Sequence, residues 1–498
     1  MEYKAITSTG NSPLKPTTLM WFRQDLRLRD NPALSFAAEQ GSVLPVYILD
    51  DSCAEQFQPG GASRWWLHHS LQSLHQSLDK QLHCLKGDAG ALLLALVKRR
   101  GIKQVVWNRC YEPWQIARDT QLKQTLLDAG VEVHSFNGHL LWEPWQVLKK
   151  DATPYKVFTP YYRRGCLGKA PPRIPVPAPQ VLNMAYFKED DQGLESLALM
   201  PNIQWYNQME GLWSPGEMGA ADALSRFLPD CLGAYKAERD FPEIQATSRL
   251  SPHLHFGEIS VNQVWYAAID AKGGNRDDTG LDCYLSELGW REFSHYLLFH
   301  FPTLPTKNFS PKFAGFPWRD DPVALSAWQR GQTGIPIVDA GMRELWQTGT
   351  MHNRVRMVVA SFLVKNLLLD WRKGERWFWD TLVDADLAAN CASWQWVAGT
   401  GADAAPYFRI FNPLLQGQRF DPKGHYVRKY CPELRQVPDK FIHHPWDAPK
   451  AILEYAKVTL GDNYPLPIVD LKASRLRALD AFALAKETHA QAKDALGE

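Results

Sequence analysis

Short apolar runs and longer amphipathic stretches alternate through the first 150 residues. The apolar runs, at 19–22, 43–49, 105–107 and 131–136, are rich in β-branched and aromatic residues, and the segments between them have helical spacing. This alternation predicts a parallel, doubly wound, Rossmann-like sheet within residues 1–150. Ligands of such sheets bind beyond the carboxyl ends of the strands, where Asp50, Asp51 and residues 108–112 fall. Solvated loop residues would give the same pattern.

A proline-rich segment interrupts the pattern. Five prolines between residues 168 and 180 exclude a regular helix, so we expect an extended connector across 151–215. Beyond it, helical patterns dominate and predict an all-helical domain over 216–498. Residues 357–371 are apolar on nearly every face, which predicts a buried helix, and the residues after Asp470 predict a short charged helix.

Composition sets limits on the function. The chain has 498 residues, a net charge of +1 and 45% hydrophobic residues, which is typical of a globular protein and neither supports nor excludes binding to DNA. No segment approaches the roughly 18 apolar residues of a membrane span, so we expect a soluble, cytoplasmic monomer. Eight cysteines without a CxxC pair predict neither a metal site nor a disulfide framework. The 20 tryptophans exceed what packing needs.

One segment of the second half has chemistry suited to phosphate. Tyr235 is followed by a Thr-Ser-Arg-Leu-Ser run at 247–251, which combines hydroxyls and a guanidinium where a helix is expected to begin. Free backbone N–H groups at such a position can hold phosphate oxygens. A helix N-cap without a ligand would look the same.

Several longer segments resemble the DNA photolyase and cryptochrome family. They are WFRQDLR at 21–27, ELGWREF at 287–293, DADLAANCASWQW at 384–396 and DAAPYFRIFNP at 403–413. The resemblance runs to Asp421 and covers most of the chain. It is greatest to bacterial class I photolyases, which split cyclobutane pyrimidine dimers.

The resemblance implies that the helical domain binds FAD in a folded conformation. The residues it assigns to FAD are Tyr235, Thr247, Ser248, Arg249, Leu250 and Ser251 near the pyrophosphate, Asp384 and Asp386 near the isoalloxazine and ribose, and also Trp290, Asn353 and Asn390. Asn390 matches the residue that faces flavin N5, where an amide adds no negative charge and favours repair over signalling. For the two aspartates, a salt bridge to a nearby arginine is the alternative.

Three tryptophans match the family's electron relay from the surface to the flavin. They are Trp394, Trp371 and Trp318, and simple core packing is the alternative for each. In the family, this relay reactivates the flavin and does not itself repair DNA.

The resemblance also implies a pocket for a flipped-out lesion. Its lining would be Glu287, Trp290, Asn353, Met357 and Trp396, with Arg291 and Arg354 on flanking phosphates and Gln416 at the rim. Photolyases that repair (6-4) photoproducts carry histidines where this chain has Asn353 and Met357, so that chemistry is not expected. His352 is expected to be structural.

We therefore expect light-driven repair of pyrimidine dimers in DNA by reduced FAD. A cryptochrome-type photoreceptor is the main alternative, and a dark flavoprotein oxidoreductase is a weaker one. Thr350 and Ile335 depart from the aromatic residues common in relatives. The N-terminal domain of relatives binds an antenna of folate, deazaflavin or a second flavin. Trp114 and Gln115 replace the Asn-Glu pair of folate-binding relatives, so the antenna is left open.

Overall fold

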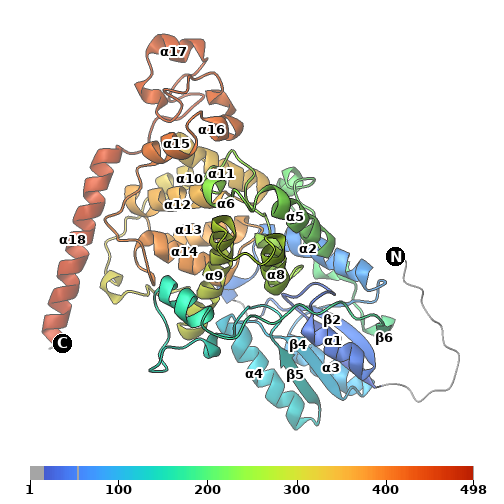
Figure 1. Ribbon diagram of the computed structural model, residues 1–498. Coiled ribbons are helices and arrows are strands. Elements are labelled where there is room, and N and C mark those ends of the chain that lie inside the picture. The colour runs from blue at the N-terminus through green and yellow to red at the C-terminus, as the bar shows by residue number, and fades with distance from the viewer. Residues whose placement is uncertain (1–15, 53–54, 497–498) are drawn as a thin grey trace.

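The computed structural model describes residues 16–52 and 55–496 (Figure 1). Its N-terminal part is a parallel sheet whose main strands have the order β3-β2-β1-β4-β5. These strands are β1 (Thr17–Phe22), β2 (Ser42–Leu49), β3 (His83–Lys86), β4 (Gln104–Asn108) and β5 (Glu132–Phe136). The crossover helices are α1 (Pro32–Gln40), α2 (Gly61–Ser77), α3 (Ala89–Arg100) and α4 (Pro113–Asp128). The predicted fold of this part is confirmed.

Alternate residues of β1 pack on opposite faces of the sheet. Trp21 belongs to the same buried cluster as Leu93 of α3, whereas Phe22 packs in a second cluster with Trp66 of α2. Successive side chains of a strand point to opposite faces, so both faces of this sheet are covered. This explains why the strands read as continuous apolar runs.

The predicted connector is more than a spacer. Its proline-rich stretch is extended, but residues Asn183–Met184 form β6, which pairs with the start of β2. The backbone of Val176 accepts a hydrogen bond from the Asp30 N–H at 2.9 Å, and Pro172 accepts one from the Tyr266 hydroxyl at 2.5 Å. The connector is therefore fixed to both halves of the chain.

The remaining chain is helical, as predicted, and no strand follows β6 among the described residues. Figure 1 shows these helices gathered above the sheet, with the last helix along one side. The helices are α5 (Glu217–Asp230), α6 (Tyr235–Glu238), α7 (Ser251–His255), α8 (Val261–Ala271), α9 (Thr279–His300), α10 (Pro322–Gln329), α11 (Pro336–Thr348), α12 (Asn353–Ser361), α13 (Trp371–Thr381), α14 (Leu387–Ala398), α15 (Pro413–Phe420), α16 (His425–Tyr430), α17 (Lys450–Tyr455) and α18 (Leu471–Leu496). Of these described helices, none is long and apolar enough to cross a membrane.

Two helix predictions were wrong in their extent. The buried segment 357–371 is not one helix: α12 ends at Ser361, a π-helical turn follows over Phe362–Asn366, and α13 begins at Trp371. Leu368, with φ of 59°, turns the chain between them. The helix after Asp470 is 26 residues long rather than short, because Ala478 and Ala481 bury one of its faces against the core.

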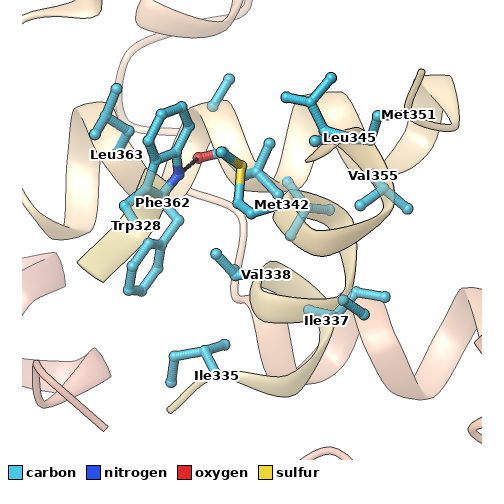
Figure 2. Packing of buried hydrophobic residues seen from close by; sticks show 14 of the residues in the cluster. Trp328, Ile335, Ile337, Val338, Met342, Leu345, Met351, Val355, Phe362 and Leu363 are labelled. Atoms are coloured by element: carbon cyan, nitrogen blue, oxygen red, sulfur yellow. Dashed lines mark hydrogen bonds between the residues drawn. The ribbon is translucent and has the colours of Figure 1, made fainter. Parts of the chain in front are cut away.

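Trp328 lies at the centre of the core that supports α12 and α13. Its side chain is 0% exposed, and its indole N–H donates to the Val359 carbonyl at 3.0 Å. Figure 2 shows the ring beside Phe362 and Met342. This contact satisfies the one polar atom of a large buried side chain.

We predict that Trp328→Ala lowers the free energy of unfolding by about 3–5 kcal/mol, because it removes a fully buried indole and leaves a cavity. Urea unfolding measures this loss. Val323→Ala, on the same helix but 78% exposed, is the control and should change stability by less than about 0.5 kcal/mol. Similar losses for the two variants would contradict the assigned core.

Candidate active site

Asp384 joins three separate segments of the helical domain. The carboxylate lies just before α14 and is only 9% exposed. It accepts hydrogen bonds from the Arg356 guanidinium of α12 at 3.0 Å and from the hydroxyl of Ser251, the first residue of α7. The arginine salt bridge weighed as an alternative is therefore present. A paired carboxylate can remain charged at this depth.

The segment predicted to bind phosphate has a cation without a counter-charge. Arg249 has a left-handed backbone with φ of 54°, and its guanidinium lies 4.1 Å from the centre of the Trp213 ring. It is exposed and donates to the Leu212 carbonyl at 3.4 Å, and it forms no ion pair with any residue in the described ranges. Thr247 beside it is exposed as well, whereas Leu250 and Tyr235 are buried. An unpaired guanidinium beside a hydroxyl fits the phosphates of FAD.

Asn390 of α14 is held by α13. Its Nδ2 donates to the backbone carbonyl of Glu375 at 3.0 Å, which fixes the orientation of the amide. Both residues line a cavity of about 160 Å³ together with Thr306, Arg372 and Leu387. Of the residues predicted to bind FAD, Asn390 alone is among the described residues that line this cavity, so its place beside flavin N5 stays a prediction.

Sequence reasoning missed Glu375. Its side chain is only 6% exposed, and burial raises its pKa to about 8, although Arg372 and Arg376 act in the opposite direction. Its spacing from Trp371 and Phe378 on α13 places it on the buried face of the helix. This spacing was the signal in the sequence that could have identified Glu375 as a buried residue.

Of the three tryptophans predicted to form the relay, the first two along the path are buried and the last is partly exposed. Trp394 and Trp371 are 2% and 0% exposed and belong to one buried cluster, and the partly exposed Trp318 packs at the edge of that cluster. The Trp371 indole donates to Asn308 at 2.9 Å, and Trp318 packs against Phe316 with ring centres 4.3 Å apart. This order suits a charge that moves from the interior towards solvent.

Two residues of the predicted lesion pocket have well-defined partners. Glu287 forms an ion pair with Arg239, the residue that directly follows α6. Trp290 stacks on Phe158 of the connector, with ring centres 3.8 Å apart and planes 12° apart. Phe158 therefore covers one face of the indole and fixes its plane.

The other predicted pocket and rim residues lie on α12, α14 and α15. Met357 and Trp396 pack at the edge of the central helical cluster, and Asn353 is exposed at the start of α12. Arg354 forms an ion pair with Asp240 at 2.7 Å, and Gln416 is partly buried on α15. Whether these five residues bind a lesion stays a prediction.

Two predicted ligand contacts gain no support from the structure. Arg291, predicted on a DNA phosphate, instead donates to the backbone carbonyl and the ring of His139 at 3.0 and 2.8 Å. Asp386, predicted near FAD, caps α14 through the Ala389 N–H and faces His255 and His295, each at 3.4 Å. Both side chains therefore already have protein partners, at the contact between the helical domain and the loop after β5.

The remaining special positions have structural explanations. His352 accepts a hydrogen bond from the Arg354 N–H at 3.2 Å and caps α12, as its predicted structural role requires. Ile335 is 1% exposed in the core. Thr350 lies 3.4 Å from the guanidinium of Arg356, the partner of Asp384.

The polar residues at the carboxyl ends of the strands are largely paired with one another. Asp51 forms an ion pair with Arg64 at 2.8 Å, and Asp50 lies 3.7 Å from Arg118. Asn108 donates to Asp25 at 2.6 Å. These contacts pair side chains that were expected to face a ligand, although one oxygen of Asp51 and the amide oxygen of Asn108 are buried without a hydrogen-bond partner among the described residues.

We predict that Glu375→Gln flattens the pH dependence of stability. Glu375 keeps its proton in the folded protein up to about pH 8 but loses it near pH 4.5 when unfolded, so wild type loses stability as the pH rises between those values. The free energy of unfolding, measured with urea, should fall between pH 5 and pH 9 in wild type. This fall should be smaller in the variant by more than about 1 kcal/mol.

Glu454→Gln is the control for this experiment, because the Glu454 side chain is 65% exposed. It should follow the wild-type pH profile. An unchanged profile in Glu375→Gln as well would contradict the burial of a protonated Glu375.

Comparison with known proteins agrees with this arrangement. Residues 18–180 match the family described as DNA photolyase, and residues 284–484 match the FAD binding domain of DNA photolyase. A deoxyribodipyrimidine photo-lyase of Agrobacterium fabrum is 51% identical over 94% of this chain and 98% of its own length. Cryptochrome-2 of Arabidopsis thaliana is 40% identical over 94% of this chain and 79% of its own length.

A solved structure is also similar over almost the whole chain. The crystal structure of a bacterial class III photolyase from Agrobacterium tumefaciens superposes with a TM-score of 0.91, with 49% identity, and covers 97% of this chain and 100% of that one. This similarity does not support the expected likeness to class I. The chain belongs to the DNA photolyase and cryptochrome family, and its helical half contains the family's FAD-binding domain.

Proposed function

We propose that this protein is a deoxyribodipyrimidine photo-lyase that splits cyclobutane pyrimidine dimers in ultraviolet-damaged DNA under blue light. When bound, reduced FAD supplies the electron that opens the dimer. The protein's part is to orient the cofactor and the lesion and to exclude water. The observation that carries the proposal is Asn390, a neutral amide fixed by the Glu375 carbonyl at the position predicted to face flavin N5.

The lesion pocket would recognise a dimer by stacking and hydrogen bonding. Trp290, fixed in its plane by Phe158, offers an indole surface for a flipped-out base, and a dimer is easier to extrude than normal bases. Glu287, as a carboxylate paired with Arg239, can accept hydrogen bonds from pyrimidine N–H groups. Arg354 would contact a flanking phosphate, so binding to duplex DNA should weaken with salt, and Gln416 would contact DNA at the pocket rim.

The two repair chemistries are distinguished by proton donors. A (6-4) photoproduct is thought to need protonation, and Asn353 and Met357 provide an amide and a thioether where a histidine pair would be required. His352 cannot substitute, because its Nδ1 caps α12 and burial lowers its pKa to about 4. The pocket therefore favours dimers.

We predict light-dependent repair of an oligonucleotide that contains a single dimer. Purified, chemically reduced protein should restore intact pyrimidines under blue light but not in darkness, as chromatography of substrate and product would show. If FAD is bound and photoreducible yet no dimer is split, the repair proposal is wrong and a photoreceptor function becomes the better hypothesis.

Trp290→Ala should weaken binding to the same oligonucleotide by about tenfold or more, because it removes one stacking surface. Trp145→Ala is the matched control, since Trp145 is 45% exposed and lies outside the pocket residues. Equal loss in both variants would contradict the stacking role of Trp290.

A further prediction separates the relay from repair. Trp371→Phe should slow photoreduction of oxidised FAD by at least about tenfold, because phenylalanine is much harder to oxidise than indole, while chemically reduced protein should keep wild-type repair. Trp265→Phe, at another buried tryptophan, is the control. Wild-type photoreduction in Trp371→Phe would exclude the relay, whatever the result of the repair assay.

A further inference from the structure

Two buried histidines and a partly buried aspartate converge where the N-terminal half meets the helical domain. His139 lies in the loop after β5, His295 lies on α9, and Asp386 lies at the start of α14. The Nε2 atoms of the two histidines are 3.2 Å apart, and the Asp386 carboxylate lies 3.4 Å from the Nε2 atom of His295. All three donor atoms lie within 4.8 Å of one another. These spacings approach the roughly 3.3 Å that separates ligands placed 2.0–2.1 Å from a tetrahedral zinc ion.

Both imidazoles direct a lone pair towards this point. The Nδ1 atom of His295 lies 3.1 Å from the Arg291 carbonyl, which can only accept, so a neutral His295 carries its proton on Nδ1. The Nε2 atom of His139 accepts from the Arg291 guanidinium. Two lone pairs and a carboxylate oxygen therefore face one another.

The charges around this cluster also call for a cation. Among the described residues, Arg291 is the one guanidinium in contact with it, and that charge is matched by Glu292 at 3.0 Å. Asp386 adds a second carboxylate, and its ion-pair partners in the described part of the chain are the imidazoles of His255 and His295 rather than an arginine or a lysine. A divalent ion held by these imidazoles would be attracted by the Asp386 carboxylate.

Each of two donors is already oriented as a metal ligand usually is. The Nδ1–H of His295 donates to a backbone carbonyl, and the second oxygen of Asp386 accepts from the Ala389 N–H at 2.8 Å. Ligating histidines and carboxylates typically have such supporting hydrogen bonds. His255, 3.4 Å from the same Asp386 oxygen, is placed to support the carboxylate or to act as a fourth ligand.

We propose that His139, His295 and Asp386 form a binding site for a divalent transition-metal ion, with zinc the best match to two imidazoles and one carboxylate. Binding requires the Arg291 guanidinium to leave the His139 ring, while its bonds to the His139 carbonyl and to Glu292 can persist. The ion would connect the loop after β5 to two helices of the FAD-binding half. Cysteine spacing could not reveal this site, because no ligand is a cysteine.

The test is zinc binding by the full-length, FAD-containing protein. After treatment with a chelator, the protein is exposed to zinc chloride, desalted and analysed by elemental mass spectrometry. Wild type should retain about one zinc ion per chain, and zinc should raise its thermal unfolding temperature, because only the folded protein assembles the site. His295→Gln and Asp386→Asn should weaken zinc binding by at least about tenfold and abolish the thermal shift.

The variants are chosen to separate metal loss from misfolding. Asparagine at 386 can still cap α14, and flavin absorbance reports whether each variant remains folded. His134→Ala is the control, because His134 forms an exposed pair with Glu132 at 2.6 Å and should leave zinc binding unchanged. The proposal would be overturned if wild type failed to retain zinc, or if Asp386→Asn bound zinc as well as wild type does. In that case, a proton on His295, shared with its neighbours, would hold the cluster together.

Discussion

Close contact between α13 and α14 is the constraint on which the active site depends. A Cβ atom built on Gly374 would overlap the Trp394 ring, so the absence of a side chain at this one position lets the indole lie against α13. Trp371, predicted to belong to the electron relay, lies one turn before this contact, and Glu375 follows it directly. Once the two helices are this close, Asn390 on α14 reaches the Glu375 carbonyl. One glycine thus positions both the predicted relay and the amide predicted to face the flavin.

A second constraint attaches this helical unit to the sheet. Arg27 is 1% exposed, yet no carboxylate of the described part of the chain forms an ion pair with it; its guanidinium donates to the carbonyls of Asp30, Gly138 and Gly257. A buried cation satisfied by carbonyls from three segments is costly to displace, because each carbonyl would lose its partner. Gly257 has φ of 69° and packs against the Gln24 backbone. The same junction places His139 beside α9, so the proposed metal site is a product of how the two halves dock.

The parts of the fold that could be predicted are those encoded by local periodicity. Four strands and the helical second half followed from apolar spacing, whereas β3 was missed because its four residues include His83 and Lys86 and leave little apolar signal. The π-helical turn at Phe362–Asn366 was invisible for the opposite reason: every face of that stretch is buried, so the pattern gives no sign of where the helix ends. Leu368 takes up a left-handed conformation without the glycine that normally marks one.

The active site shows the same division between local and long-range information. Asn390 and Trp394 lie one helical turn apart, so the sequence alone places them on one face of α14. The partner of Arg291 is different, because His139 is 152 residues away and belongs to the other half of the chain. A guanidinium binds the acceptors that the docked fold places beside it, and here these are the His139 carbonyl, the His139 ring and Glu292. Family resemblance can therefore transfer the identity of such a residue, while its role depends on contacts that only the assembled structure defines.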